Sequence, residues 1–156
     1  MTAALRLVLA AGALAALPLA PAALGAQAPA APSPAAAAAD SLAFPRQFVK
    51  WIFASQGDSA FAHAAPTLRQ SMQSAEAVSG MAGRILARFG EQQGTDAEVQ
   101  FDDGALRVYI VAMRFAQAPE PGAFVVAYVP ATQVVERASF TSLTNVKTRY
   151  PQAKLP

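Results

Sequence analysis

The chain has 156 residues, no cysteine and one histidine, and its formal net charge is +2. The lack of cysteine excludes disulfides, thiolate metal sites and a cysteine nucleophile, and one histidine cannot build a multi-histidine metal site. Without Arg6, 11 basic residues stand against 10 acidic ones, so the rest of the chain is nearly neutral. We therefore expect no cofactor, no metal and no nucleic-acid partner.

The first 39 residues differ in composition from the rest of the chain. They contain 19 alanines and a single charged residue, Arg6, whereas the rest of the chain carries the other 21 charges. A positive residue, the apolar run 7–17 and the small residue Ala26 together form the pattern of a secretory signal peptide. We predict a signal peptide over 1–26, cleaved after Ala26, and an exported protein, either periplasmic or secreted. An uncleaved membrane anchor is the alternative, and only in that case do we expect contact with a membrane.

Residues 27–39 consist of alanine, proline, serine and one glutamine. They have no large apolar side chain to bury, so we predict a disordered, extended linker. The 117 residues that follow suit one domain with one core.

Three helical segments are predicted at the start of this domain. The first begins near Phe44 and repeats apolar residues at helical spacing. The second runs over 59–72 and is kinked or split at Pro66, because proline lacks the backbone N–H that a helix interior needs. The third runs over 75–89 and ends at Gly90, the residue type favoured just after a helix.

The apolar period then changes from about 3.6 residues to 2, which indicates strands. The predicted strands are one around Val99, a long one over 105–116 with apolar residues on both faces, one over 123–129 and one over 132–141. The last 15 residues, 142–156, show little periodicity, and we expect an irregular C-terminal tail.

Helices that precede all the strands indicate an α+β fold. We expect the domain, 40–141, to consist of three N-terminal helices packed on a curved four-stranded antiparallel sheet, whose strands pair in chain order as a meander. The reason is that a twisted sheet and the helices each have one face to bury.

One set of packing and capping residues follows a characteristic order along the chain: Phe48, Val49, Trp51, Gly57, Asp58, Phe61, Pro66, Leu68 and the run from Met81 to Gly90. This order resembles domain of unknown function 3887, a small secreted bacterial domain of the nuclear-transport-factor-2-like, or cystatin-like, superfamily. The resemblance implies a half-open cone with a pocket between helices and sheet. It also makes the outer face of the sheet a candidate homodimer surface, because the superfamily often pairs its sheets. The superfamily includes isomerases and dehydratases, but a shared fold does not carry function.

No catalytic motif is recognisable by its spacing. His63 has no acid or nucleophile at a defined spacing, so we interpret it as a histidine beside an apolar face, with a general base as the alternative. Tyr109 and Tyr128, on adjacent predicted strands, either pack with their hydroxyls at the rim or donate to a substrate carbonyl. The neighbouring carboxylates Asp102 and Asp103 are interpreted as turn residues.

Three arginines are candidates for ion pairs or for anion binding. Arg114 interrupts an apolar strand and needs a partner if it is buried. We expect either a structural ion pair, for which Glu136 of the fourth strand is a candidate, or a solvated strand end, with a ligand carboxylate as the alternative. Arg84 and Arg88 lie four residues apart on the third helix, and we interpret them as a solvated face, with a weak anion patch as the alternative.

The leading hypothesis is an exported, non-catalytic binding or accessory module. It binds a small apolar or amphipathic ligand, or an envelope protein, through the cleft between helices and sheet or through the sheet face. The residues expected around this cleft are Phe44, Phe48, Trp51, Phe61, Phe89, Tyr109, Arg114, Phe115 and Tyr128. The alternative is a small enzyme of the isomerase or dehydratase type that uses tyrosine or histidine in the cleft. A structural envelope protein without a ligand is the third hypothesis.

Overall fold

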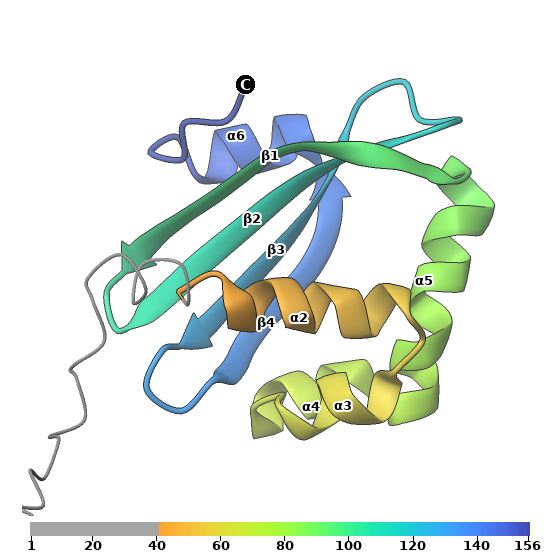
Figure 1. The fold of residues 1–156 in the computed structure, drawn as a ribbon. Coiled ribbons are helices and arrows are strands. Elements are labelled where there is room, and N and C mark those ends of the chain that lie inside the picture. The colour runs from red at the N-terminus through yellow and green to blue at the C-terminus, as the bar shows by residue number, and fades with distance from the viewer. Residues whose placement is uncertain (1–40) are drawn as a thin grey trace, which may run out of the picture. The chain divides into compact units, whose positions relative to one another are not determined.

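A computed structural model describes residues 41–156, which form five helices and one four-stranded antiparallel sheet (Figure 1). Four of these helices precede the sheet and one follows it, so the predicted α+β class and the antiparallel sheet are confirmed. The predicted signal peptide and linker lie outside the described residues. Within 41–156, no helix is long and apolar enough to cross a membrane.

The helices before the sheet begin and end where the local sequence requires it. They are α2 (Ala43–Phe53), α3 (Gly57–Ala62), α4 (Pro66–Met72) and α5 (Ala75–Phe89). Pro66 is the first residue of α4, a position where the missing N–H costs nothing. The segment predicted as one kinked or split helix is therefore split. Ser74 caps α5 by accepting a hydrogen bond from the Ala77 N–H at 3.2 Å.

The four strands pair in chain order, each antiparallel to the next. They are β1 (Gln92–Asp103), β2 (Leu106–Phe115), β3 (Gly122–Val129) and β4 (Val134–Ser142). The two inner strands, β2 and β3, are buried on both faces along most of their length. This explains why their sequences are almost continuously apolar rather than alternating.

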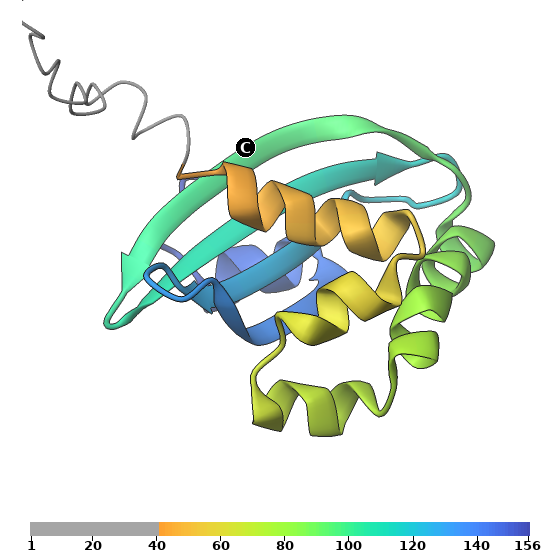
Figure 2. The same ribbon diagram turned by 60° about the horizontal axis from the view of Figure 1, so that its bottom comes forward.

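One face of the sheet packs against the helices, and the sheet curves over them (Figure 2). The core on this side contains Phe48 and Ile52 of α2 together with Tyr109, Phe124 and Val126 of the sheet, all at most 1% exposed. The centre of the helix–sheet interface is therefore filled with side chains.

The opposite face of the sheet carries a second apolar core, which corrects the predicted C-terminal tail. Residues 143–149 form a helix, α6 (Leu143–Arg149), and its Leu143 and Val146 are buried against β2 and β3. Tyr150 completes this contact, with its ring centroid 5.8 Å from that of Phe101. The segment is ordered because its three large apolar side chains cover strand residues that would otherwise face water.

This packing also bears on the outer face of the sheet, which the family resemblance made a candidate homodimer surface. Ile110, Ala112 and Val125 of that face lie at 0–5% exposure in the single chain, under α6 and the residues that follow it. The chain itself therefore covers this central part of the outer face.

Candidate functional site

A hollow of about 390 Å³ opens where α5 ends, where β2 turns toward β3, and where β4 ends. Three aromatic rings line it, those of Phe89, Phe115 and Phe140, with centroids between 5.6 and 6.1 Å apart. Its remaining lining residues are Arg88, Ala118, Pro119, Glu120, Pro121, Gly122, Thr141 and Ser142. We call this hollow the aromatic pocket. Its volume lies within the range of small-molecule sites, about 300–1,000 Å³.

The chain reversal after α5 positions the first of these rings. Gly90 ends the helix with a φ angle of 79°. Residues other than glycine rarely adopt this backbone conformation. The Phe89 carbonyl then accepts a hydrogen bond from the Gln117 N–H at 2.9 Å, which ties the end of α5 to the end of β2. Phe89 is thereby held beside Phe115.

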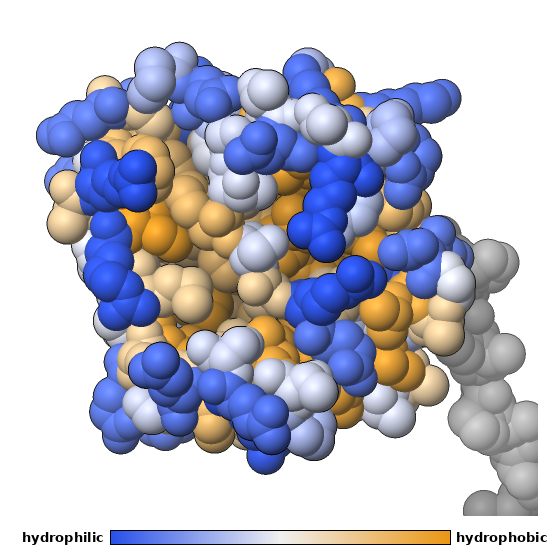
Figure 3. All heavy atoms as spheres, turned by 180° about the vertical axis from the view of Figure 1, so that it is seen from behind, coloured by the Kyte–Doolittle hydropathy of each residue, from blue (hydrophilic) through white to orange (hydrophobic). Residues whose placement is uncertain are grey.

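Two further hollows follow β4 away from the aromatic pocket. One, of about 280 Å³, lies between α4, α5 and Ala138, and the other, of about 360 Å³, lies between α4 and residues 136–138. We call the aromatic pocket and these two hollows together the α5–β4 groove. The view from behind in Figure 3 shows hydrophobic side chains gathered in hollows between hydrophilic projections.

One edge of β4 pairs with β3 along the strand, whereas its other edge pairs, within residues 41–156, with the chain only at Val135. Val135 donates to the His63 carbonyl and accepts from the Ala65 N–H, both at 2.8 Å, which makes a short parallel bridge. This bridge covers the beginning of the outer edge of β4. It shows that an extended segment can lie along that edge.

Further along β4, the hydrogen-bond pattern shows which residues point outward. The Leu143 N–H donates to the Pro121 carbonyl at 3.0 Å, and hydrogen-bonded positions alternate along an antiparallel pair. Positions 139 and 141 therefore pair with β3, whereas Ala138 and Phe140 turn their N–H and C=O groups away from it. No backbone hydrogen bond within residues 41–156 reaches these outward groups.

The helix side of the groove carries positive charge. Arg84 donates from Nη2 to the Ala77 carbonyl at 3.0 Å, and the Arg88 guanidinium lies 5.2 Å from the centroid of the Phe89 ring. Among the described residues, neither arginine forms an ion pair. The carboxylates of Glu120 and Glu136 line the two ends of the groove rather than its middle.

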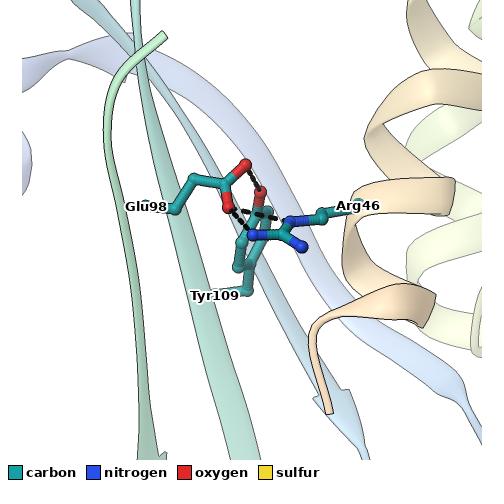
Figure 4. Close-up of polar contacts among 3 residues, drawn as sticks. All are labelled: Arg46, Glu98 and Tyr109. Atoms are coloured by element: carbon teal, nitrogen blue, oxygen red, sulfur yellow. Dashed lines mark hydrogen bonds and ion pairs between the residues drawn. The ribbon is translucent and has the colours of Figure 1, made fainter. Parts of the chain in front are cut away.

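Tyr109, a predicted cleft residue, lies in a polar cluster with Glu98 and Arg46 (Figure 4). Its hydroxyl donates to Glu98 Oε1 at 3.0 Å, and Arg46 donates from Nε to Oε2 of the same carboxylate at 2.8 Å. Burial of the ring and, next, the adjacent Glu98 carboxylate raise the pKa of Tyr109. This cluster ties α2 to β1 and β2, and with 1% exposure Tyr109 does not line an open cleft.

Trp51 and Tyr128 lie at the opposite end of the sheet from the aromatic pocket. The Trp51 ring stacks on His63 at 5.0 Å between centroids, and Phe44 lies between His63 and Tyr128, at 5.4 and 5.2 Å. Tyr128 is buried and its hydroxyl donates to the Ser41 carbonyl at 3.1 Å. Burial raises the pKa of Tyr128. The rings of this group therefore pack on one another.

Two further predicted cleft residues, Phe61 and Arg114, lie apart from both aromatic groups. Phe61 of α3 is half-buried under the Arg69 guanidinium, 5.6 Å from the ring centroid. Arg114 is exposed and forms an ion pair with Asp96 of β1. The expected structural pairing at an exposed strand end is thus confirmed. The candidate partner Glu136 is wrong because β4 is not adjacent to β2, whereas β1 is.

The structure therefore does not bring the predicted cleft residues into one cleft, and among them Phe89 and Phe115 line the groove. Sequence reasoning missed Phe140 as a site residue. It also interpreted Arg84 and Arg88 as a solvated face. The four-residue spacing of the two arginines beside Phe89 was the available signal.

Residues 41–156 contain no group of three or more His, Asp or Glu side chains that could hold a metal ion. No protein-family model matches the chain, and comparison with curated proteins and with solved structures gives no significant match. The resemblance to domain of unknown function 3887 therefore stays a prediction.

Proposed function

We propose that this protein is an exported binding module that holds an amphipathic ligand in the α5–β4 groove. The observation that carries the proposal is the aromatic pocket itself, three phenylalanine rings around about 390 Å³ with Arg88 at the rim. Apolar walls with one charged group fit a ligand that has an apolar body and an anionic end. In this interpretation the half-open cone is open along β4 rather than at its centre.

The alternative function, a small isomerase or dehydratase, has less support. The hydroxyls of Tyr109 and Tyr128 are buried and already donate to protein acceptors, Glu98 and the Ser41 carbonyl. The His63 ring stacks on Trp51, and its Nδ1 lies 3.3 Å from the Gln133 carbonyl oxygen. An acid–base role requires a group that can reach the reacting atoms of a substrate.

A fluorescence titration with 1-anilinonaphthalene-8-sulfonate, an aromatic anion, tests the proposed site. Arg88→Gln removes a charge-assisted contact, and we expect it to weaken binding about 5- to 10-fold. Phe89→Ala removes one wall and should weaken binding by a comparable factor. The matched control is Arg149→Gln, because Arg149 also lies over an aromatic ring, at 5.7 Å from the Tyr150 centroid, but in α6. Equal affinity in all four proteins would contradict the proposed site.

Export is tested separately by the mass of the chain recovered from a bacterial host. A chain that begins at Gln27 supports cleavage after Ala26 and a periplasmic or secreted location. A chain that retains residues 1–26 would instead support the membrane-anchored alternative.

A further inference from the structure

We propose that the natural occupant of the α5–β4 groove is an extended segment of another protein, which adds to the sheet beside β4. The segment carries two apolar side chains two residues apart and a carboxylate near them. This inference rests on the proposed function and names the class of ligand for the same groove.

The first argument is the unpaired backbone of β4. Ala138 and Phe140 direct N–H and C=O groups into the groove, and residues 41–156 give these groups no backbone partner. An added strand satisfies such groups with main-chain hydrogen bonds. Near the start of β4, residues 63–65 of the chain already pair with the same edge through the main-chain bridge to Val135.

The second argument is the contrast between the two edges of the sheet. The outer strand β1 has register irregularities at 92–94 and at 95–97, and charged residues such as Asp96 interrupt it. Irregular and charged edges resist strand addition. The pairing of β4 is irregular only between Ala127 and Tyr128 and is regular from position 137 to 142. The edge beside the groove is thus the one that suits an incoming strand.

The third argument is the fit of side chains. Alternate residues of an added strand point to the same face of the sheet, about 6.6–6.8 Å apart. Two residues of the added strand would lie beside Phe140 and Ala138. The side chain of the first would point toward the aromatic pocket, and that of the second toward the neighbouring hollow that Met81 helps to line. Two apolar side chains two residues apart match these two hollows.

The fourth argument is charge complementarity. Arg84 and Arg88 line the helix side of the groove one turn apart, and neither forms an ion pair with a described carboxylate. A carboxylate on the incoming segment would give one or both a partner. Glu120 and Glu136, at the two ends, would disfavour acidic residues beyond the central part of the segment.

The test begins with a displayed library of random octapeptides selected on the full chain, with counter-selection on an Arg84→Glu/Arg88→Glu double variant. We expect enriched peptides to contain a carboxylate next to apolar residues at alternate positions. An enriched peptide should lose at least 10-fold in affinity when its backbone amides are methylated at alternate positions, since methylation removes main-chain donors. Failure to enrich any sequence on the wild type over the double variant would overturn the proposal.

Amide hydrogen exchange measures the proposed pairing directly. On binding of the enriched peptide, the amides of Ala138 and Phe140 should become at least 10-fold slower to exchange. The amides of Ser139 and Thr141 serve as controls, because β3 already pairs them. Peptide binding that leaves the first two amides unchanged would overturn strand addition.

An Ala138→Pro variant supplies an independent check, because proline removes the outward N–H while edge positions tolerate it. We expect thermal unfolding to stay cooperative and peptide affinity to fall at least 10-fold. If this variant does not fold, the double arginine variant and the exchange data still decide the question. Retention of peptide binding by a folded Ala138→Pro variant counts against the proposal.

The same experiments separate this inference from the proposed function. If 1-anilinonaphthalene-8-sulfonate binds in an Arg88-dependent manner but no peptide does, the groove is a small-molecule site and strand addition is wrong. If neither binds, both proposals fail. If the free protein is a dimer in which the Ala138 and Phe140 amides are protected until dilution, a second copy occupies the groove, and the external segment is wrong.

Discussion

Phe140 of β4 lies against the backbone of Gly122 in β3, so closely that a Cβ added at Gly122 would come within 2.4 Å of the Phe140 Cζ atom. The same added atom would lie 3.2 Å from Phe115. Two of the three rings of the aromatic pocket therefore depend on a glycine in the neighbouring strand. The pocket has its present shape because this position lacks a side chain.

Gly122→Ala should displace the Phe140 ring and alter the aromatic pocket. We expect a loss of about 1–3 kcal/mol in the free energy of unfolding, the usual cost of overpacking, together with weaker binding of 1-anilinonaphthalene-8-sulfonate. Urea unfolding and the fluorescence titration measure the two effects. Gly83→Ala is the control, because a Cβ there meets nothing within 4 Å and an added alanine in α5 should stabilise by about 0.5–1 kcal/mol. Unchanged stability and affinity in Gly122→Ala would show that Phe140 moves aside freely.

Tyr109 should make the stability of the protein fall in alkaline solution. Burial and the Glu98 carboxylate raise its pKa above the ordinary value of 10.0, so the folded state holds the hydroxyl proton where the unfolded chain loses it. The resulting stabilisation is fully present below about pH 10 and is lost as the pH rises toward the pKa of the folded state, with a slope of up to about 1.4 kcal/mol per pH unit.

Urea unfolding of the wild type and of Tyr109→Phe between pH 8 and pH 11 measures this effect. We expect Tyr109→Phe to be less stable by about 1 kcal/mol near pH 8, because the hydrogen bond to Glu98 is lost. Above pH 10 the difference should shrink, since the variant has no proton to lose at this position. Tyr128, whose pKa is also raised by burial, still contributes to the remaining slope. Parallel curves for the two proteins up to pH 11 would refute the assigned role of Tyr109.

Gly57 is expected to be intolerant of any side chain. A Cβ at this position would lie 2.0 Å from the Ala75 carbonyl oxygen and 2.4 Å from Ser79 Oγ at the contact between α3 and α5. Because one of these atoms belongs to the backbone, Gly57→Ala should cost about 3 kcal/mol or more in unfolding free energy. A Gly57→Ala/Ser79→Ala double variant should regain little of this loss, since the carbonyl clash remains. Substantial recovery in a thermal unfolding experiment would mean that the hydroxyl contact dominates.

The sequence predicts the fold class well because periodicity reports which residues are buried. The change from a helical to an alternating apolar pattern places α5 and the sheet correctly, and Pro66 marks the split between α3 and α4. Periodicity does not predict helix α6 because the helix has only two turns. Its apolar residues Leu143, Val146 and Tyr150 repeat at helical spacing, but the residues between them are polar and their burial comes entirely from tertiary contact.

The site is harder to predict because it depends on which strands are neighbours. Phe140 looks like an ordinary strand core residue in the sequence, and it lies beside open space because α5 ends there and β4 is an edge strand. Phe115 is predicted as a cleft residue, but nothing in the sequence pairs it with Phe140. Arg114 illustrates the same limit. Its partner is Asp96 of β1, the strand that the predicted turn at Asp102 and Asp103 already places beside β2. Asp96 lies in the register irregularity at 95–97, which the sequence does not predict.

The C-terminal segment should be required for a soluble domain. A chain that ends at Ser142 loses the side chains of Leu143, Val146 and Tyr150, and each large apolar residue stabilises by about 1.5–3 kcal/mol when buried. The combined loss is comparable with the total stability of a typical domain, so we expect aggregation or a non-cooperative unfolding transition in circular dichroism. Val146→Ala is the milder test and should cost about 1–3 kcal/mol, whereas the exposed neighbour Lys147→Ala should change stability by about 0.5 kcal/mol or less. A truncated chain that unfolds cooperatively as a dimer would instead show that the face under α6 is self-complementary, and that α6 competes with a second copy for it.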